Sequence, residues 1–133
     1  MRIVIDTNVL MAGLISNSIV RRLLVSGKAA FYLPEFALEE VEKYEGLLKD
    51  KAGFSNEDFL KLKGMLLESI IVVPKKLTDK HMKEALAIME NIGKKDSVFI
   101  ACALAISADG IFSFDKDFLQ QKSVRCFGVK DLV

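Results

Sequence analysis

Short runs of β-branched and other apolar residues alternate along the chain with longer segments in which apolar residues recur at helical spacing. The first pattern is typical of buried strands, and the second of helices with one apolar face. Strands that alternate with helices usually form βαβ units. The pattern therefore predicts an α/β fold built on a parallel sheet.

The predicted strands are five short segments, residues 2–5, 30–33, 70–73, 111–113 and 124–127. The predicted helices cover residues 7–15, 18–26, 34–51, 55–68, 78–91, 96–107 and 116–121. Pro34 is expected to open the longest helix, and Thr78 to cap the helix that begins there.

Two of these elements carry a stronger expectation about burial. The strand at residues 70–73 is entirely β-branched, which predicts that the sheet buries both of its faces. The helix from Asp96 is apolar almost all round, which predicts a place in the core against the sheet. Because the sequence contains no repeat and no flexible linker, we expect a single domain over residues 1–133.

Composition narrows the class of protein. The chain has 51% hydrophobic residues, and its formal net charge of +1 gives no global bias toward polyanions. Cys102 and Cys126 form no CxxC pair, which fits reduced thiols in a cytoplasmic protein. Asp6 interrupts what would be the apolar region of a signal peptide, and Asp109 breaks the apolar run of residues 98–114. We therefore expect neither secretion nor a membrane segment.

Four acidic residues occupy positions that a parallel sheet brings to one edge. Asp6 ends the first strand, and Glu40 lies early in the helix after the second. Asp96 begins the apolar helix that leads into the fourth strand, and Asp115 follows that strand. Because all strand-to-helix junctions of a parallel sheet emerge on the same side, these carboxylates could share one pocket. Asp117 is a fifth candidate.

Each acid also has an ordinary structural explanation. Asp6, Asp96 and Asp115 stand where a side chain could cap a helix N-terminus. Glu40 could lie on a solvated helix face, and Asp117 on the surface. The spacing of the acids alone leaves both interpretations open.

A carboxylate cluster of this kind favours metal chemistry. Clustered carboxylates repel one another until a proton or a cation compensates their charge, and Mg²⁺ prefers oxygen ligands. Such a site suits phosphodiester hydrolysis by a metal-activated water. His81 is the only histidine, so a ribonuclease mechanism with two histidines is excluded. The sequence has no GxSxG or GxGxxG motif, and the glycine before Lys94 lacks the rest of a P-loop.

The acids lie in four short motifs: DTNVL at residues 6–10, LPE at 33–35 followed by EEV at 39–41, DSVFIA at 96–101, and SFDKDF at 113–118. In this order the motifs resemble those of PIN domain ribonucleases, including the toxin-type (VapC-like) members. The resemblance covers essentially the whole chain. In the second motif we assign the acidic ligand to Glu40 in preference to Glu39.

The resemblance implies a three-layer α/β/α sandwich with a central parallel sheet of four to five strands. It implies a metal-dependent ribonuclease with Mg²⁺ or Mn²⁺ held by four acids: Asp6, Glu40, Asp96 and Asp115. Asp117 stays an additional candidate ligand because of its position in the chain. Thr7, Asn8 and Ser113 match positions that support the acids by hydrogen bonding. The resemblance also implies RNA as substrate, a homodimer and, for a toxin, a protein antitoxin.

RNA would approach an acidic pocket only if cations offset the repulsion. Lys94, Lys95 and Lys116 adjoin the predicted pocket and are our candidates for contacting phosphates, which would make binding sensitive to salt. With no tryptophan and two tyrosines, the sequence offers no obvious platform on which bases could stack.

Two other functions stay open at this point. One is a catalytically inactive PIN domain that acts as an RNA- or protein-binding adaptor. The other is a phosphatase of the haloacid dehalogenase type with Asp6 as nucleophile. That chemistry normally uses a second aspartate two positions later, where this chain has Asn8.

Overall fold

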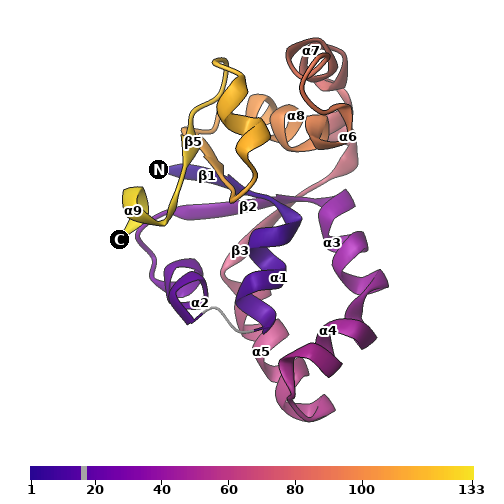
Figure 1. Ribbon diagram of the computed structural model, residues 1–133, viewed down its shortest axis with the longest axis vertical. Coiled ribbons are helices and arrows are strands. Elements are labelled where there is room, and N and C mark those ends of the chain that lie inside the picture. Colours follow the sequence, from indigo (N-terminus) through magenta and orange to yellow (C-terminus); the bar gives the residue numbers. More distant parts are fainter. Residues whose placement is uncertain (16–17) are drawn as a thin grey trace.

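The computed structural model describes residues 1–15 and 18–133 and contains a parallel five-stranded sheet in the order β3-β2-β1-β4-β5 (Figure 1). Its strands are β1 (Arg2–Ile5), β2 (Ala30–Pro34), β3 (Ile70–Val73), β4 (Gly110–Phe112) and β5 (Cys126–Phe127). Each described pairing between neighbouring strands is parallel, as the alternation of strands and helices predicted.

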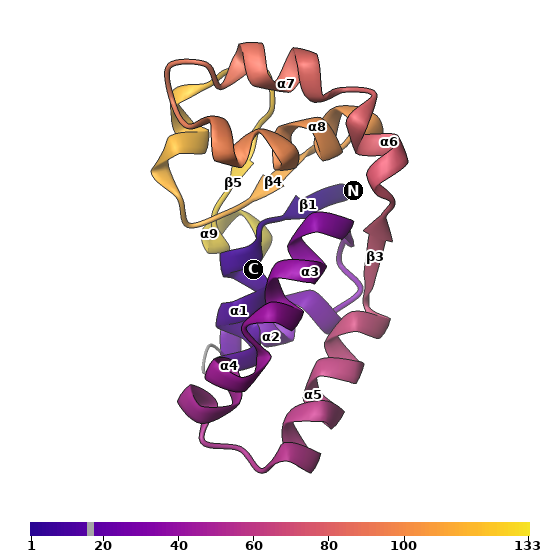
Figure 2. The same ribbon diagram turned by 90° about the vertical axis from the view of Figure 1, so that its right-hand side faces the viewer.

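Helices cover both faces of the sheet. The α-helices are α1 (Thr7–Ile15), α2 (Ser18–Val25), α3 (Glu35–Lys43), α4 (Glu45–Ala52), α5 (Asn56–Glu68), α6 (Lys75–Asp79), α7 (Met82–Ile88), α8 (Ser97–Ala105) and α9 (Val129–Leu132). Two 3₁₀ turns, η1 (Lys94–Asp96) and η2 (Lys116–Gln120), flank α8 and β4. Figures 1 and 2 show α6, α7 and α8 on one side of the sheet and α1 to α5 on the other. The three-layer α/β/α sandwich is thereby confirmed.

The centre of the sheet is fully buried. Ile3, Val4 and Ile5 of β1 have no exposed surface, because α8 contacts β1, β2 and β4 from one side and helices cover the other. Most of α8 is buried, including Ile100 and Ala101, so its predicted place in the core is confirmed. The apolar strands thus act as a fixed base for the polar residues that follow them.

The predicted helix at residues 34–51 is wrong in its extent. Pro34 ends β2, and the chain then forms α3 and α4 with a break at Tyr44, whose φ of −100° and ψ of 13° interrupt the helix. The break turns α4 back toward α1 and buries Leu48. Burial of this apolar side chain outweighs the few helical hydrogen bonds that are lost.

The expectation that Thr78 caps a helix is also wrong. Pro74 occupies the N-cap of α6, and Thr78 lies inside that helix, buried, with its hydroxyl donating to the carbonyl of Lys75 at 3.0 Å. A second helix, α7, begins only after His81. The proline starts the helix earlier than the threonine because its fixed φ suits the beginning of a helix.

The predicted burial of both faces of residues 70–73 is wrong as well. The strand lies at the edge of the sheet, next to β2 only, and the side chain of Ile71 is 50% exposed.

No single described helix is long and apolar enough to cross a membrane. The pair formed by α1 and Ile19–Val25, bent by 112°, meets that criterion of length and composition together.

Candidate metal centre

A pocket of about 310 Å³ opens at the carboxyl ends of β1 and β4. These strands are neighbours, with Ile5 paired to Phe112, so the residues that follow them lie side by side. All four acids selected from the sequence line this pocket: Asp6, Glu40, Asp96 and Asp115. The fold therefore brings them together, and their roles as metal ligands remain predictions.

Asp6 is a buried carboxylate with hydrogen bonds on both oxygens. Its side chain is 4% exposed. Its Oδ1 accepts a bond from the backbone N–H of Val9 at 2.9 Å, and its Oδ2 accepts one from the hydroxyl of Ser113. Burial raises the pKa of Asp6, and the negative charge of Asp115 adds to the effect. Asp6 thus caps α1 and also belongs to the pocket.

Ser113 connects two of the acids. Besides donating to Asp6, its Oγ accepts a bond from the backbone N–H of Asp115 at 2.9 Å. The Oδ1 atom of Asp115 in turn accepts from the N–H of Asp117 at 2.9 Å, and so caps η2. For Asp6 and Asp115, capping and a place in the pocket occur together, because each cap uses one carboxylate oxygen.

Asp96 does not cap the helix that follows it. It occupies the N-cap of α8, but its side chain makes no capping hydrogen bond. Its Oδ2 is buried, and no hydrogen-bond partner for this atom exists in the described chain. Burial raises the pKa of Asp96, as do the charges of Asp115 and Asp117, while Lys95 opposes the shift. A buried carboxylate oxygen without a donor is unfavourable unless a cation or a proton compensates it.

Asp117 forms a close acidic group with Asp96 and Asp115. One carboxylate oxygen from each of the three lies within 4.8 Å of the others, and all three side chains are partly buried. Two oxygens on opposite sides of a Mg²⁺ ion are about 4 Å apart. The spacing of this triad is therefore close to that of ligands around one divalent ion.

Glu40 reaches the pocket from α3 and is held there by Thr7. The hydroxyl of Thr7, at the start of α1, donates to Oε1 of Glu40 at 2.9 Å. Asn8 lines the same pocket with an exposed side chain. Of the three predicted supporting residues, Thr7 and Ser113 hydrogen-bond acids of the pocket.

Of the three lysines selected from the sequence, one lines the acidic pocket and two do not. Lys95 lines the acidic pocket, whereas Lys94 lines an adjoining one. Lys116 is exposed at the start of η2 and is not among the residues that line either pocket.

Sequence reasoning missed Gly93, which leaves space for two of the acids. A Cβ atom at this position would lie 3.0 Å from Oδ2 of Asp117 and 3.4 Å from Oδ2 of Asp96. A side chain at this position would therefore crowd the carboxylate of Asp117 and require it to shift by a few tenths of an ångström. The only sign in the sequence is a glycine three positions before the third acidic motif.

Two exposed aromatic side chains that line the pocket were missed as well. Phe36 is 46% exposed and Tyr44 is 43% exposed, and both line the acidic pocket. The expectation that the chain lacks a stacking platform rested on its tryptophan and tyrosine content, and Phe36 was overlooked.

The family comparison agrees with this geometry. A family model of the PIN domain matches residues 4–126, which include all four acidic motifs. The chain belongs to the PIN domain family. PIN domains are in general nucleases that use divalent metal ions, and an acidic triad is present in this chain. A search of curated proteins finds no match to the chain.

Proposed function

We propose that this PIN domain protein is a metal-dependent ribonuclease that hydrolyses RNA phosphodiester bonds at the acidic pocket. The observation that carries the proposal is the buried, unpartnered Oδ2 of Asp96 within a triad of carboxylates. A divalent cation fits this donor set, because it would compensate both the missing hydrogen bond and the repulsion between the acids. Mg²⁺ and Mn²⁺ are the proposed ions.

The proposed ligands are the four acids that line the pocket, Asp6, Glu40, Asp96 and Asp115, together with Asp117. When bound, the ion would activate a water molecule and stabilise negative charge on the leaving oxygen. Thr7 orients Glu40, and Ser113 orients Asp6 and the backbone of Asp115. Lys95, on the wall of the same pocket, attracts the phosphate against the charge of the acids.

The proposal extends to the biology of the protein. The resemblance to toxin-type PIN domains supports a cytoplasmic toxin of a type II pair that acts as a homodimer and is restrained by a protein antitoxin. It also supports a single nuclease domain over residues 1–133. Co-expression with a small protein encoded directly upstream, followed by co-purification and measurement of the complex mass, tests the antitoxin and the dimer together.

Substitution Asp6→Asn is the main test of the ribonuclease. The amide oxygen of asparagine can still accept from the N–H of Val9, and the neutral side chain no longer buries a charge, so the fold should persist. Replacing even a residue that only supports a metal ligand commonly costs 10–100-fold. We therefore expect RNA cleavage with Mg²⁺ or Mn²⁺ to fall by more than about 100-fold.

The matched control is Asp109→Asn. Asp109 also accepts from a backbone N–H, that of Arg2 at 2.8 Å, but at the opposite end of β1. This variant should cleave like the wild type, and chelation of divalent ions should stop cleavage by both. Cleavage by Asp6→Asn at the wild-type rate, or cleavage that survives chelation, would show that the proposed site is wrong.

A further inference from the structure

A second pocket, of about 270 Å³, adjoins the acidic one. Phe36 and Lys95 line both pockets and form their common wall. The second pocket lies between α3, α6, α7 and α8, so it is built from helices and not from strand ends. Its volume is near the lower limit for small-molecule sites, about 300 Å³, which suits a group the size of one nucleobase.

Much of the lining of this pocket is apolar. It includes Phe36 on α3, Met82 on α7 and Val98 on α8. Phe36 is 46% exposed, and no ring or cation packs against it in residues 1–15 and 18–133. An exposed aromatic face beside a nuclease site offers a surface on which a base can stack, since every base has a π-face.

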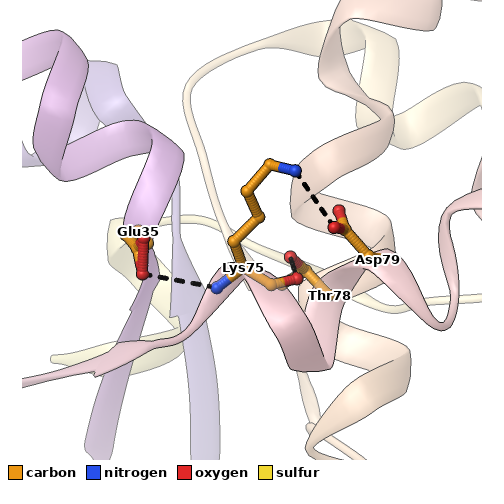
Figure 3. Close-up of polar contacts among 4 residues, drawn as sticks. All are labelled: Glu35, Lys75, Thr78 and Asp79. Atoms are coloured by element: carbon orange, nitrogen blue, oxygen red, sulfur yellow. Dashed lines mark hydrogen bonds and ion pairs between the residues drawn. The ribbon is translucent and has the colours of Figure 1, made fainter.

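The rim of the pocket is basic. Lys94 and Lys95 are exposed, and within the described chain neither forms an ion pair. Lys75 also lines the pocket, but its Nζ is 3.1 Å from Oδ2 of Asp79 (Figure 3), so its charge is already partly compensated. The two unpaired lysines are therefore the groups best suited to meet phosphate oxygens.

Contacts between helices hold the walls of the pocket in place. The backbone N–H of Lys75 donates to Oε1 of Glu35 at 3.5 Å, which joins the start of α6 to the start of α3 (Figure 3). The hydroxyl of Thr78 donates to the carbonyl of Lys75 and closes the turn of α6. The first bond joins α3 to α6 and the second stabilises α6, so the protein's own hydrogen bonds hold two walls of the pocket.

We infer that this pocket binds one unpaired base of an RNA strand whose adjacent phosphate lies in the acidic pocket. The base would stack on Phe36, and Lys94 and Lys95 would contact the backbone between the two pockets. This inference rests on the proposed ribonuclease function and adds to it a subsite for one base, built by α3, α6, α7, α8 and η1. A base inside a duplex has both faces covered by its neighbours and cannot enter such a pocket.

The test measures binding separately from cleavage. Fluorescence anisotropy with a labelled single-stranded oligoribonucleotide, in the presence of a chelator, compares the full-length wild type with Phe36→Ala and Phe36→Tyr. Stacking of one base corresponds to about 5- to 150-fold in affinity. We expect Phe36→Ala to weaken binding by about 10-fold and Phe36→Tyr, which keeps an aromatic face, to restore it.

A matched control and an altered RNA separate stacking from other effects. Phe54→Ala removes another exposed phenylalanine, in the connection between α4 and α5, and should leave binding unchanged. An oligoribonucleotide that carries abasic positions should bind the wild type as weakly as the intact strand binds Phe36→Ala. The same abasic strand should lose nothing further when Phe36 is removed. Thermal melts by circular dichroism check that all variants are folded.

Four results would overturn the inference. Phe36→Ala could bind the intact strand as tightly as the wild type does, the abasic strand could bind the wild type as well as the intact one, or duplex RNA could depend on Phe36 to the same degree. A Phe36→Ala variant that loses a protein partner while keeping its RNA affinity would also overturn it, and would assign the pocket to that partner.

The inference and the ribonuclease proposal fail in different ways. If Phe36→Ala cleaves and binds like the wild type, the base pocket is wrong and the nuclease stands. If the stacking effects appear but no cleavage occurs with either metal, the base pocket stands and the nuclease is wrong.

Discussion

The two pockets on either side of Phe36 have opposite chemistry, although they are similar in volume, about 310 and 270 Å³. The acidic pocket takes its charged groups mainly from residues next to strand ends, such as Asp6 after β1 and Asp115 after β4. The second pocket takes apolar and basic side chains from helices and from η1. In this fold the strand ends supply the groups suited to chemistry, and the surrounding helices supply the groups suited to holding a polymer.

The acids and the lysines also differ in exposure, and a cation and an RNA strand need different exposure in the groups that bind them. Asp6 and Asp96 are buried or partly buried, and burial raises the pKa of both. Lys94 and Lys95 are exposed and free to meet a flexible chain. An ion in the acidic pocket should therefore change the stability of the fold, whereas the lysines should change only the affinity for RNA.

The largest effect that tests this separation is stabilisation by Mn²⁺. If the acids form one site that exists only in the folded state, an ion at one hundred times its Kd should add about 2.7 kcal/mol to the free energy of unfolding. For a chain of this size that corresponds to a rise in Tm of roughly 10 °C. Thermal melts of wild type and Asp96→Asn measure it, and the variant should show a much smaller rise.

The dependence of this stabilisation on pH is the internal control. Because the folded-state pKa values of Asp6 and Asp96 are raised above the ordinary carboxyl value, these groups favour the folded state most at low pH. That contribution is lost as the pH rises through the raised values. Protons and Mn²⁺ then compete for the same oxygens, so the rise in Tm should be larger at neutral pH than at about pH 4. An equal rise at both pH values would argue against an ion on these carboxylates.

A smaller effect is expected from Thr7→Val, which tests whether the hydrogen bond from Thr7 to Glu40 supports metal binding. Valine has the shape of threonine but cannot donate to Glu40, so Glu40 loses its 2.9 Å hydrogen bond while the fold is kept. Loss of such a supporting bond typically costs 10–100-fold in metal affinity or activity. We expect the Kd for Mn²⁺ to weaken by about 10-fold, measured by calorimetric titration.

Ser55→Ala is the contrasting variant for Thr7→Val. It removes a hydrogen bond from the N–H of Asp58 at the start of α5, far along the chain from the acidic motifs. Loss of this cap should lower stability by about 1 kcal/mol and leave the affinity for Mn²⁺ unchanged. Equal losses of Mn²⁺ affinity in both variants would mean that Thr7 acts only through general stability.

The smallest effect concerns the basic rim. The double variant Lys94→Gln/Lys95→Gln should weaken RNA binding mainly at low salt. On a single strand, each lysine that neutralises a phosphate adds about 0.7 to the slope of log Kd against log salt concentration. The slope should therefore fall by about 1.4. The double variant Lys51→Gln/Lys61→Gln, on α4 and α5, changes the net charge equally and should leave the slope unchanged. Identical slopes for the two double variants would exclude the rim.

Local patterns were sufficient to predict the sheet and the gathering of the acids. Apolar runs and intervening helices require a parallel sheet, and topology alone then brings Asp6 next to the segment after β4. The break at Tyr44 and the edge position of Ile71 were not predictable in this way. Both depend on which surfaces remain covered after the helices pack, and no local pattern contains that information.

The same reasoning explains the parts of the site that were missed. The unpartnered Oδ2 of Asp96 and the space at Gly93 are properties of side chains that meet only in the folded molecule. The sequence contained one indication that Phe36 lies outside the core. Ala37 and Val41, four positions apart, form the buried face of α3, and Phe36 lies beside that face. An apolar residue off the buried stripe of a helix is a candidate for contacts outside the core.

The position of Asp6 links the acidic pocket to the backbone of α1. One oxygen of this carboxylate receives the amide proton of Val9, and the side chain of Val9 is itself entirely enclosed. A cation bound to Asp6 would compete with that amide proton for the electron density of the carboxylate, and would so weaken the cap on the first turn of α1. The helix α1, which packs against α2, α3 and α4, is therefore coupled to the occupancy of the acidic pocket through the backbone of its first turn.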